Sequence, residues 1–422
     1  MYKKTVLNNG LRIITHNIKD RDSIALGFWV GVGGRYEDDR IKGIAHFLEH
    51  VVFKGSQKYS GEEIKMRIEG IGGALNAFTS EEQTCFYAKI PSKHLNQTFD
   101  VLADMVLHPQ ITAKDAGKEK TVIVEEIKMY HDLPQYFVME LLDGLLWPDH
   151  PLGKSLAGTK ESVMGISRKD LKKFHQLFYA PGNIVVAACG NLTHSKITAL
   201  VKKKLGKLRL SDKIGFCKAD EIQIQPRTRF YKKNIEQMHL ALGLPAYNEK
   251  HKDRYVLSLL STILGGNMSS RLFVEVREKK GLAYSISCSY KAFHDTGLFL
   301  IRAGVDNKKI VQTVNLILQE LDKIRRQGVG RNEFLRAREY LSGQLLLGLE
   351  DTMEHMLWIG EGMLTTNRIK TRTSIMKELK KIKPADIKRV ANDVINVNRY
   401  NLAIVGPVTG LQEKQLRLMM KV

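Results

Sequence analysis

The sequence predicts an α+β protein made of two homologous, duplicated domains, each a mostly antiparallel sheet flanked by helices. Two observations support this prediction. The chain has 422 residues, which is more than one ordinary hydrophobic core accommodates. It also carries an internal repeat, because 216 positions separate Asp170 from Asp386 and the same 216 separate Gly190 from Gly406. A repeat of about half the chain length indicates a duplicated domain.

Both copies of the repeat are predicted to form a helix followed by a strand. Each begins with a helix-capping pattern and ends in an apolar run that stops at glycine. The first copy comprises residues 166–173 and 184–188, and the second comprises residues 382–389 and 402–405. Elsewhere the sequence alternates strand-like runs with helical patterns, giving expected strands at 84–90 and 238–244 and expected helices at 93–107 and 254–264. The polar stretch 207–229 is the expected linker between domain 1–206 and domain 230–422.

Composition and charge favour an ordinary globular protein. The residues are 43% hydrophobic and 26% charged, and the net charge is +21. The lysines are spread along the whole chain, without an Arg-rich tail or interleaved aromatic residues, so we interpret them as a solvated surface and expect no nucleic-acid partner. No apolar run approaches the roughly 18 residues of a membrane helix, so no membrane insertion is expected.

The cysteines and the N-terminal segment bear on localisation. Four cysteines lie far apart with no Cys-x-x-Cys pair, which excludes a thiolate zinc site of the usual spacing and gives no reason to expect disulfides. The chain enters a strand-like segment at once, without the apolar core of a signal peptide. We therefore expect a cytoplasmic protein or, alternatively, the mature chain of a protein of an organelle matrix.

A His-x-x-Glu-His motif is the first candidate for chemistry. His46 and His50 are four residues apart, so on a helix both imidazoles reach one ion. Glu49 lies close enough to hold a water against that ion. The alternative is that two histidines on an apolar helix are buried core residues, and the motif therefore needs a third ligand.

The helical pattern at residues 116–131 offers that ligand. Glu126 shares a mostly apolar face with Glu119, Val122, Ile123 and Tyr130, whereas Glu125 shares a face with lysines and reads as solvent-facing. A carboxylate on a buried face must be paired or bound to metal. Glu126 is therefore the better ligand, and Glu119 could orient a histidine. The alternative to a metal-binding helix is a surface helix with several Glu–Lys ion pairs.

These motifs together resemble the inverzincin zinc peptidases, the family of pitrilysin, insulin-degrading enzyme and mitochondrial processing peptidase. The resemblance covers nearly the whole chain. It includes Gly34-Arg35-Tyr36-Glu37 before the metal motif and Asn76-Ala77-Phe78-Thr79-Ser80 after it. In the second half it includes Ser270-Arg271-Leu272-Phe273 and the segment from Arg277 to Tyr284.

The resemblance implies a zinc metalloendopeptidase that cleaves short or unfolded peptides. His46, His50 and Glu126 would bind Zn²⁺, and Glu49 would be the general base. Arg277 and Tyr284 match an Arg and a Tyr of the family's second domain that reach the active site, where they would stabilise negative charge. These assignments make 1–206 the zinc-binding catalytic domain. They make 230–422 a homologous domain that completes the substrate chamber without a zinc motif.

The resemblance also implies how substrates and partners bind. Asn76, Ala77 and Phe78 would lie on an edge strand that binds an extended peptide, although the pattern alone favours an internal strand. Short family members pair, so a homodimer or a related partner subunit is expected. Processing peptidases carry two acidic residues where this chain has Tyr136 and Glu140, so a short bacterial-type peptidase is preferred over an arginine-directed one. The alternative is a non-catalytic structural subunit of the same family, which the four retained metal-motif residues disfavour.

Overall fold

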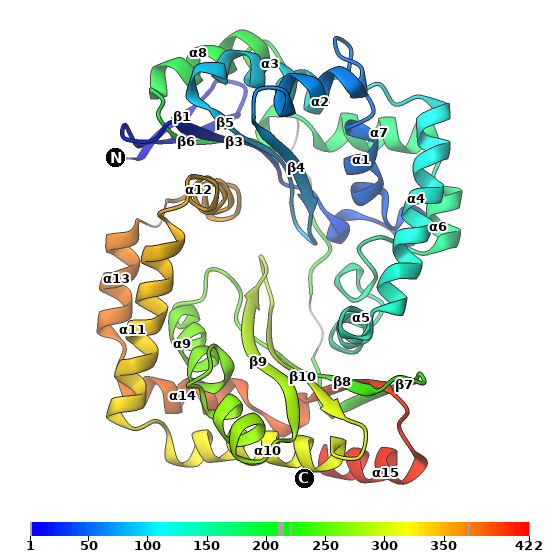
Figure 1. Ribbon diagram of the computed structural model, residues 1–422, viewed down its shortest axis with the longest axis vertical. Helices are drawn as coiled ribbons and strands as arrows, with labels where there is room; N and C mark the ends of the chain where they lie inside the picture. The colour runs from blue at the N-terminus through cyan, green and yellow to red at the C-terminus, as the bar shows by residue number, and fades with distance from the viewer. Residues whose placement is uncertain (1, 210–214, 220–221, 370, 422) are drawn as a thin grey trace. The chain divides into compact units, whose positions relative to one another are not determined.

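The computed structural model describes residues 2–209, 215–219, 222–369 and 371–421, and they form two compact units (Figure 1). Unit 1 comprises Met1–Ile127, Ser155–Cys217 and Leu346–Thr371. Unit 2 comprises Lys128–Lys154, Lys218–Leu345 and Arg372–Val422. These units differ from the contiguous domains expected at 1–206 and 230–422, because each contains a segment from the other half of the sequence. The expected linker 207–229 includes residues 210–214 and 220–221, which lie outside the described residues.

The sheet of unit 1 has six strands in the order β1-β2-β6-β3-β5-β4. Its strands are β1 (Tyr2–Val6), β2 (Arg12–Asn17), β3 (Ser23–Val30), β4 (Ala74–Thr79), β5 (Thr84–Pro91) and β6 (Ile184–Gly190). β2 and β6 are parallel, and all the other neighbours are antiparallel. Every residue of β6 is buried. Continuous burial of this kind indicates that helices cover both faces of the sheet.

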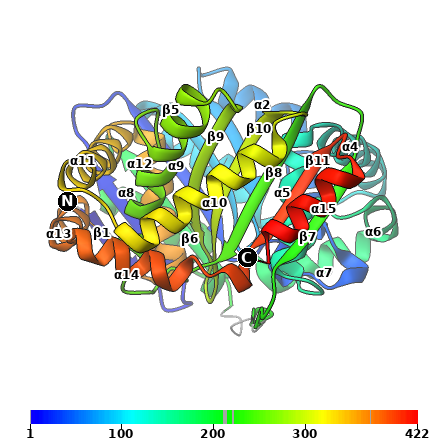
Figure 2. The ribbon, with the colours of Figure 1, turned by 90° about the horizontal axis from the view of Figure 1, so that it is seen from below.

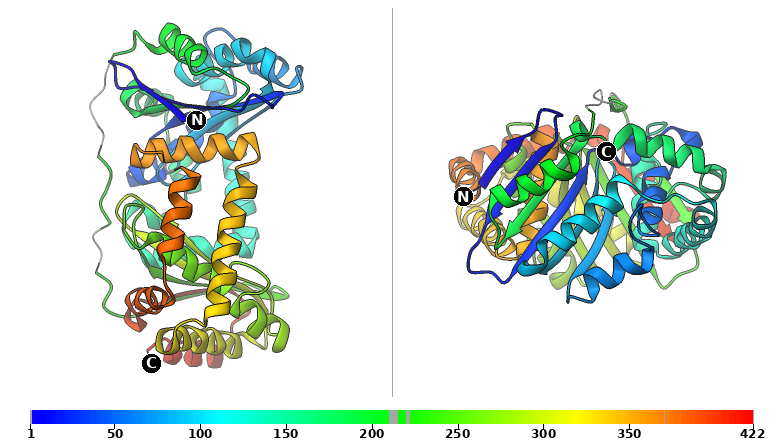
Figure 3. Two further views of the ribbon diagram at one scale, coloured as in Figure 1. Left: turned by 90° about the vertical axis from the view of Figure 1, so that its left-hand side faces the viewer. Right: turned by 90° about the horizontal axis from the view of Figure 1, so that it is seen from above.

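Helices do cover both faces of this sheet. α2, α3 and α8 lie on one face, and α12 lies on the other (Figure 1, Figure 3). The helices are α1 (Ile44–Val52), α2 (Gly61–Glu69), α3 (Leu95–Leu107), α4 (Ala113–Asp132), α6 (Lys160–Gly165), α7 (Arg168–Phe178), α8 (His194–Leu205) and α12 (Thr352–Thr366). Short 3₁₀ turns in the chain are Gly34–Tyr36, Asp39–Ile41, Ser92–His94, Pro151–Gly153, Pro181–Asn183 and Val397–Arg399.

The sheet of unit 2 has five strands in the order β7-β11-β8-β10-β9. They are β7 (Arg227–Lys232), β8 (Gln237–Pro245), β9 (Ala283–Ala292), β10 (Gly297–Asp306) and β11 (Asn401–Gly406). α9, α10, α14 and α15 lie on one face, and α5 packs against β8 and β11 on the other (Figure 2). The helices are α5 (Pro134–Leu146), α9 (Arg254–Gly265), α10 (Ile310–Gln327), α11 (Arg331–Gly348), α13 (Arg372–Lys381), α14 (Pro384–Val394) and α15 (Gly410–Met419), with a π-helical segment at Phe273–Lys279.

The two sheets confirm the predicted duplication. The order β2-β6-β3-β5-β4 of unit 1 matches β7-β11-β8-β10-β9 of unit 2, with the single parallel pair at the same place. The repeat found in the sequence corresponds to α7 with β6 in the first copy and to α14 with β11 in the second. Gly190 and Gly406 end these strands with φ of +126° and +151°, a conformation that favours glycine.

The two units exchange equivalent helices. α5 comes from the first half of the sequence and packs on the sheet of unit 2, whereas α12 comes from the second half and packs on the sheet of unit 1. Met356, Ile359 and Met363 of α12 join a buried cluster with Trp29. Gly360 permits this approach, because a Cβ there would lie 2.1 Å from Trp29 Nε1. In the described part of the chain, no helix combines the length and hydropathy needed to cross a membrane.

Candidate metal centre

Helix α1 presents the His-x-x-Glu-His motif, and a buried carboxylate determines where this helix begins. Glu37 accepts hydrogen bonds from the N–H groups of Gly43, at 2.9 Å, and Ala45, at 2.8 Å, so it satisfies two donors of the first helical turn. Lys42 Nζ lies 3.2 Å from the same carboxylate. Gly43 has φ of +94°, and a Cβ there would lie 2.5 Å from the carbonyl oxygen of Ala157. The segment before the motif therefore positions the helix.

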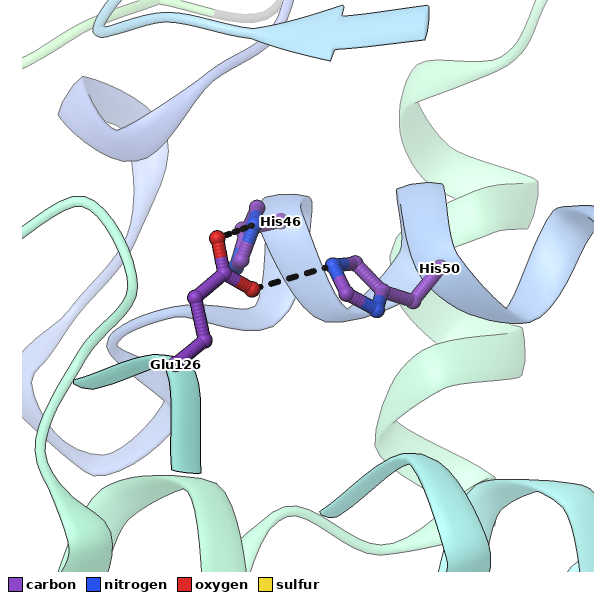
Figure 4. Close-up of side chains that lie close together, drawn as sticks. All are labelled: His46, His50 and Glu126. Atoms are coloured by element: carbon purple, nitrogen blue, oxygen red, sulfur yellow. Dashed lines mark ion pairs between the residues drawn. The ribbon is translucent and has the colours of Figure 1, made fainter. Parts of the chain in front are cut away.

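The structure brings His46, His50 and Glu126 together (Figure 4). Phe47, Leu48 and other apolar residues of α1 are buried in the core, which leaves the two histidines on the opposite side. His46 Nε2 lies 3.7 Å from Glu126 Oε1, and His50 Nε2 lies 3.4 Å from Glu126 Oε2. The ligand atoms all lie within 4.8 Å of one another. The predicted grouping of two imidazoles and one carboxylate is therefore present in the geometry.

These three side chains have the chemistry of a zinc site. Burial lowers the pKa of His46 to about 4, with the neighbouring His50 acting in the same direction. His46 is therefore neutral near pH 7, the form in which a ring nitrogen offers its lone pair to a metal. Two imidazole nitrogens and one carboxylate oxygen are a donor set typical of catalytic zinc, which keeps a fourth position for water or substrate. The residues fit a divalent metal.

Glu119 contacts the outer nitrogen of His50. Its Oε2 accepts a hydrogen bond from His50 Nδ1 at 3.1 Å, and its Oε1 lies 2.7 Å from Lys54 Nζ. Burial lowers the pKa of His50, but the carboxylates of Glu126 and Glu119 raise it by more, so the net shift is upward. A carboxylate on the second ring nitrogen fixes the tautomer that directs Nε2 toward the ligand cluster.

Glu49 lies beside the cluster with a partner that the sequence did not suggest. Thr79 Oγ1 donates a hydrogen bond of 2.5 Å to Glu49 Oε2. Burial raises the pKa of Glu49, while the bond from Thr79 opposes the shift. Thr79 is the last residue of β4, so one hydrogen bond ties the candidate base to that strand. Thr79 belongs to a segment that the resemblance includes, but no spacing rule predicts its hydrogen bond to Glu49, because that contact depends on tertiary structure.

Strand β4 carries Asn76, Ala77 and Phe78 and forms one edge of the sheet in unit 1. Within the described residues, β4 pairs with β5 alone. The expectation of an internal strand, which the pattern alone favoured, is therefore wrong. An edge strand has one row of backbone groups that can pair with an extended peptide. That use of β4 remains a prediction.

Helix α4 buries a different face from the predicted one, and the choice of Glu126 as the ligand remains a prediction. Glu125 is exposed, and Glu126 is directed to the histidines. Val122 and Tyr130 were expected on the inward face, yet they are 48% and 36% exposed. The buried residues are instead Ala116, Glu119, Ile123, Val124 and Ile127. The inward stripe is centred about one position away from the predicted one, so Glu126 lies at its border, where a carboxylate remains accessible to a ligand.

Arg277 and Tyr284 belong to unit 2. Arg277 lies in the π-helical segment, with its guanidinium carbon 4.7 Å from the ring centroid of Phe273. Tyr284 stands near the start of β9 and is 60% exposed. π-helical turns are rare and occur frequently at functional sites. The catalytic assignment of both residues remains a prediction.

Comparisons with known proteins agree along the chain. Residues 12–160 match the family model described as insulinase (peptidase family M16), and residues 165–341 match that of the peptidase M16 inactive domain. An uncharacterized zinc protease of Bacillus subtilis is 36% identical over 407 residues, covering 96% of this chain and 98% of the relative. A solved protease from Helicobacter pylori superposes with a TM-score of 0.90 at 25% identity, covering 96% of this chain and 99% of that chain. A peptidase M16 inactive domain from Pseudomonas fluorescens shares the fold, with a TM-score of 0.88 at 20% identity, covering 97% and 98% of the two chains.

Proposed function

The chain belongs to the M16 peptidase family, and from this we propose that it is a zinc metalloendopeptidase that cleaves short or unfolded peptides. One observation carries the proposal. The Nε2 atoms of His46 and His50 converge on the Glu126 carboxylate, with Glu49 on the same helix turn. In this proposal the first three residues hold the zinc ion and Glu119 orients His50. The alternative of a non-catalytic subunit is disfavoured, because a scaffold requires none of these side chains.

The chemistry follows from the residues around the ion. Zinc held by His46, His50 and Glu126 would supply Lewis-acid chemistry, which polarises a carbonyl and lowers the pKa of water. Glu49 accepts a proton from that water at its carboxylate and later donates it to the leaving amine. Thr79 holds the Glu49 carboxylate in one orientation through its 2.5 Å hydrogen bond. Tyr284 and Arg277 donate hydrogen bonds to the negative charge that develops on the carbonyl oxygen.

Substrate binding is assigned to the edge strand of unit 1. Asn76, Ala77 and Phe78 of β4 pair with the backbone of an extended peptide, which gives affinity with loose sequence preference. Thr79 ends this strand and bonds to Glu49, so a peptide added to β4 runs past the base. The proposal includes a second copy of the chain or a related subunit as partner. It also includes a cytoplasmic location, which the free cysteines Cys85, Cys189 and Cys288 support.

The test compares wild type with Glu49→Gln for zinc content and for cleavage of a quenched-fluorescence peptide library. About one zinc per chain is expected in both proteins, because Glu49 is not a ligand, and cleavage is expected in wild type alone. Glu125→Gln is the matched control, since Glu125 is exposed on α4 and its loss leaves the site intact. Absence of zinc from wild type after reconstitution, or equal cleavage by Glu49→Gln, would refute the proposal.

A further inference from the structure

A polar pocket of about 420 Å³ lies in unit 2, on the face of the sheet that α5 covers. The first turn of α5 forms one wall, and strands β8, β9 and β10 form the floor. The polar residues of the lining are Gln135, Tyr136, His239, Ser285, Ser287 and Arg302. Polar groups that converge in a pocket can fix the orientation of a polar ligand.

The pairing of the strands explains why these side chains meet. Arg302 of β10 pairs with Ser287 of β9, and Gly304, two residues further along, pairs with Ser285 of β9 and His239 of β8. Residues two apart in a strand point to the same face, and so do direct cross-strand partners. The guanidinium, the two hydroxyls and the imidazole therefore line one small area of the sheet.

Gly304 keeps the floor of the pocket open. A Cβ at this position would lie 3.2 Å from Ser285 Oγ and 3.6 Å from His239 Cε1. Its φ does not fall in the left-handed region, so glycine is not needed for the backbone conformation. The missing side chain instead leaves space between the polar groups, which a ligand atom can occupy.

The charge of the pocket selects the kind of ligand. Arg302 Nε donates to Ser287 Oγ at 3.3 Å, and no ion pair of Arg302 occurs among the described residues. No carboxylate occurs among the described residues that line the pocket. Burial lowers the pKa of His239, so its imidazole is neutral near pH 7 and Arg302 supplies the charge. A guanidinium with nearby hydroxyl donors, next to the positive end of helix α5, matches a carboxylate.

We propose that this pocket binds a carboxylate of the peptide substrate, and that Arg302 thereby selects acidic peptides. The inference rests on the proposed peptidase function. It is tied to that function along the chain, because Tyr284, the proposed hydrogen-bond donor to the reacting carbonyl, directly precedes Ser285 of the pocket in β9. The α5 residues of the lining begin nine residues after the proposed zinc ligand Glu126. The carboxylate is that of a Glu or Asp side chain or of the peptide C-terminus.

The experiment compares kcat/KM for matched peptides that carry Glu, Gln or Lys at one position, each with a free or an amidated C-terminus. Arg302 is exposed, so wild type is expected to prefer the carboxylate over its amide by about two- to fivefold, the range of an ion pair open to solvent. In Arg302→Gln the ratio of kcat/KM for the carboxylate peptide to that for its amide is expected to fall close to one. Arg302→Glu is expected to prefer the peptide that carries Lys. Gly304→Ala is expected to weaken the preference by filling the floor. Lys291→Gln is the matched control, because Lys291 is a cation of the same sheet outside the lining and should leave the ratio unchanged.

The outcomes separate the inference from the function on which it rests. A preference for Glu over Gln that persists in the amidated peptides assigns the pocket to the side-chain carboxylate. A preference for the free over the amidated C-terminus, whichever residue stands at the varied position, assigns it to the C-terminal carboxylate. Both results support the pocket. An unchanged ratio in Arg302→Gln, with cleavage intact, overturns the inference and leaves the peptidase function standing. If wild type cleaves no peptide, the proposed function fails. Fluorescence anisotropy then tests the pocket separately, by measuring how labelled Glu and Gln peptides bind to wild type and to Arg302→Gln. If wild type binds the Glu and Gln peptides with equal affinity, the inference is overturned.

Discussion

Glu119 offers a quantitative test of how the zinc site is organised, because this residue touches a ligand without being one. Its carboxylate accepts from His50 Nδ1 at 3.1 Å and lies 2.7 Å from Lys54 Nζ, and its side chain is 7% exposed. We expect Glu119→Ala to weaken zinc binding about 100-fold and Glu119→Gln about tenfold, the two ends of the range typical of such partners.

The expected magnitudes follow from what each variant leaves behind. Alanine removes the acceptor, so the His50 ring is free to rotate or to change tautomer, and Nε2 is no longer held toward Glu126. A 100-fold loss corresponds to about 2.7 kcal/mol of binding free energy. Glutamine retains an oxygen that can accept from Nδ1, but it loses the negative charge that makes the imidazole a better donor to the metal. A tenfold loss, about 1.4 kcal/mol, is therefore expected.

Zinc affinity is measured by competition with a chromophoric chelator, and thermal unfolding checks that each variant is folded. Lys54→Gln is the control. The Lys54 side chain is 38% exposed, so the loss of its ion pair should change zinc affinity less than about fivefold. A folded Glu119→Ala protein with the zinc affinity of wild type would show that Glu119 does not position His50.

Three further predictions concern stability. Gly360→Ala is expected to destabilise the protein by about 1–3 kcal/mol in denaturant unfolding, because its Cβ would lie 2.1 Å from Trp29 Nε1. Gly362→Ala, whose Cβ would lie 3.5 Å from the carbonyl oxygen of Arg368, should instead stabilise α12 by up to about 1 kcal/mol. Zinc at 100 times its Kd is expected to raise the free energy of unfolding by about 2.7 kcal/mol, and a chelator should reverse the change in melting temperature; a melting temperature indifferent to zinc would count against a site in the folded state. Burial raises the pKa of Asp351, but Lys89 and the first backbone N–H groups of α12 lower it by more, so its ionised form stabilises the fold above the unfolded pKa and this contribution is lost as pH falls through the lower folded pKa. Asp351→Asn keeps a capping side chain, and its stability deficit against wild type should therefore shrink below about pH 4 in unfolding experiments; a deficit constant with pH would contradict the assignment.

Local patterns were sufficient for much of this molecule. The repeat offset predicted the duplicated topology, because a capped helix followed by a strand ending at glycine is encoded by neighbouring residues. Helical spacing also placed His46 and His50 on one side of α1 and distinguished Glu126 from Glu125. The buried stripe of α4 was misplaced by about one position at Val122, because periodicity fixes the direction of a face only to within the angle between adjacent residues, about 100°.

Contacts made by residues distant in sequence could not be found in this way. The hydrogen bond from Thr79 to Glu49 joins the end of a strand to a helix 30 positions earlier, and no spacing rule links them. The pocket around Arg302 likewise depends on the register of three strands. A single exposed arginine in a strand has no signature in sequence until its cross-strand partners are known.

The exchange of α5 and α12 follows from the duplication. Because of it, the two compact units do not coincide with the two halves of the sequence. The two helices occupy equivalent places after β5 and β10 in the repeated order of elements, and each packs on the sheet built mainly by the other half of the sequence. Their apolar faces predict burial without saying against which sheet. Residues 1–206 alone would leave Trp29 and the other residues on that face of the first sheet without the cover of Met356, Ile359 and Met363. A sheet face of this kind cannot remain exposed without cost. The half that carries the zinc ligands therefore depends on the other half for a complete core, even though the second half has no metal motif of its own.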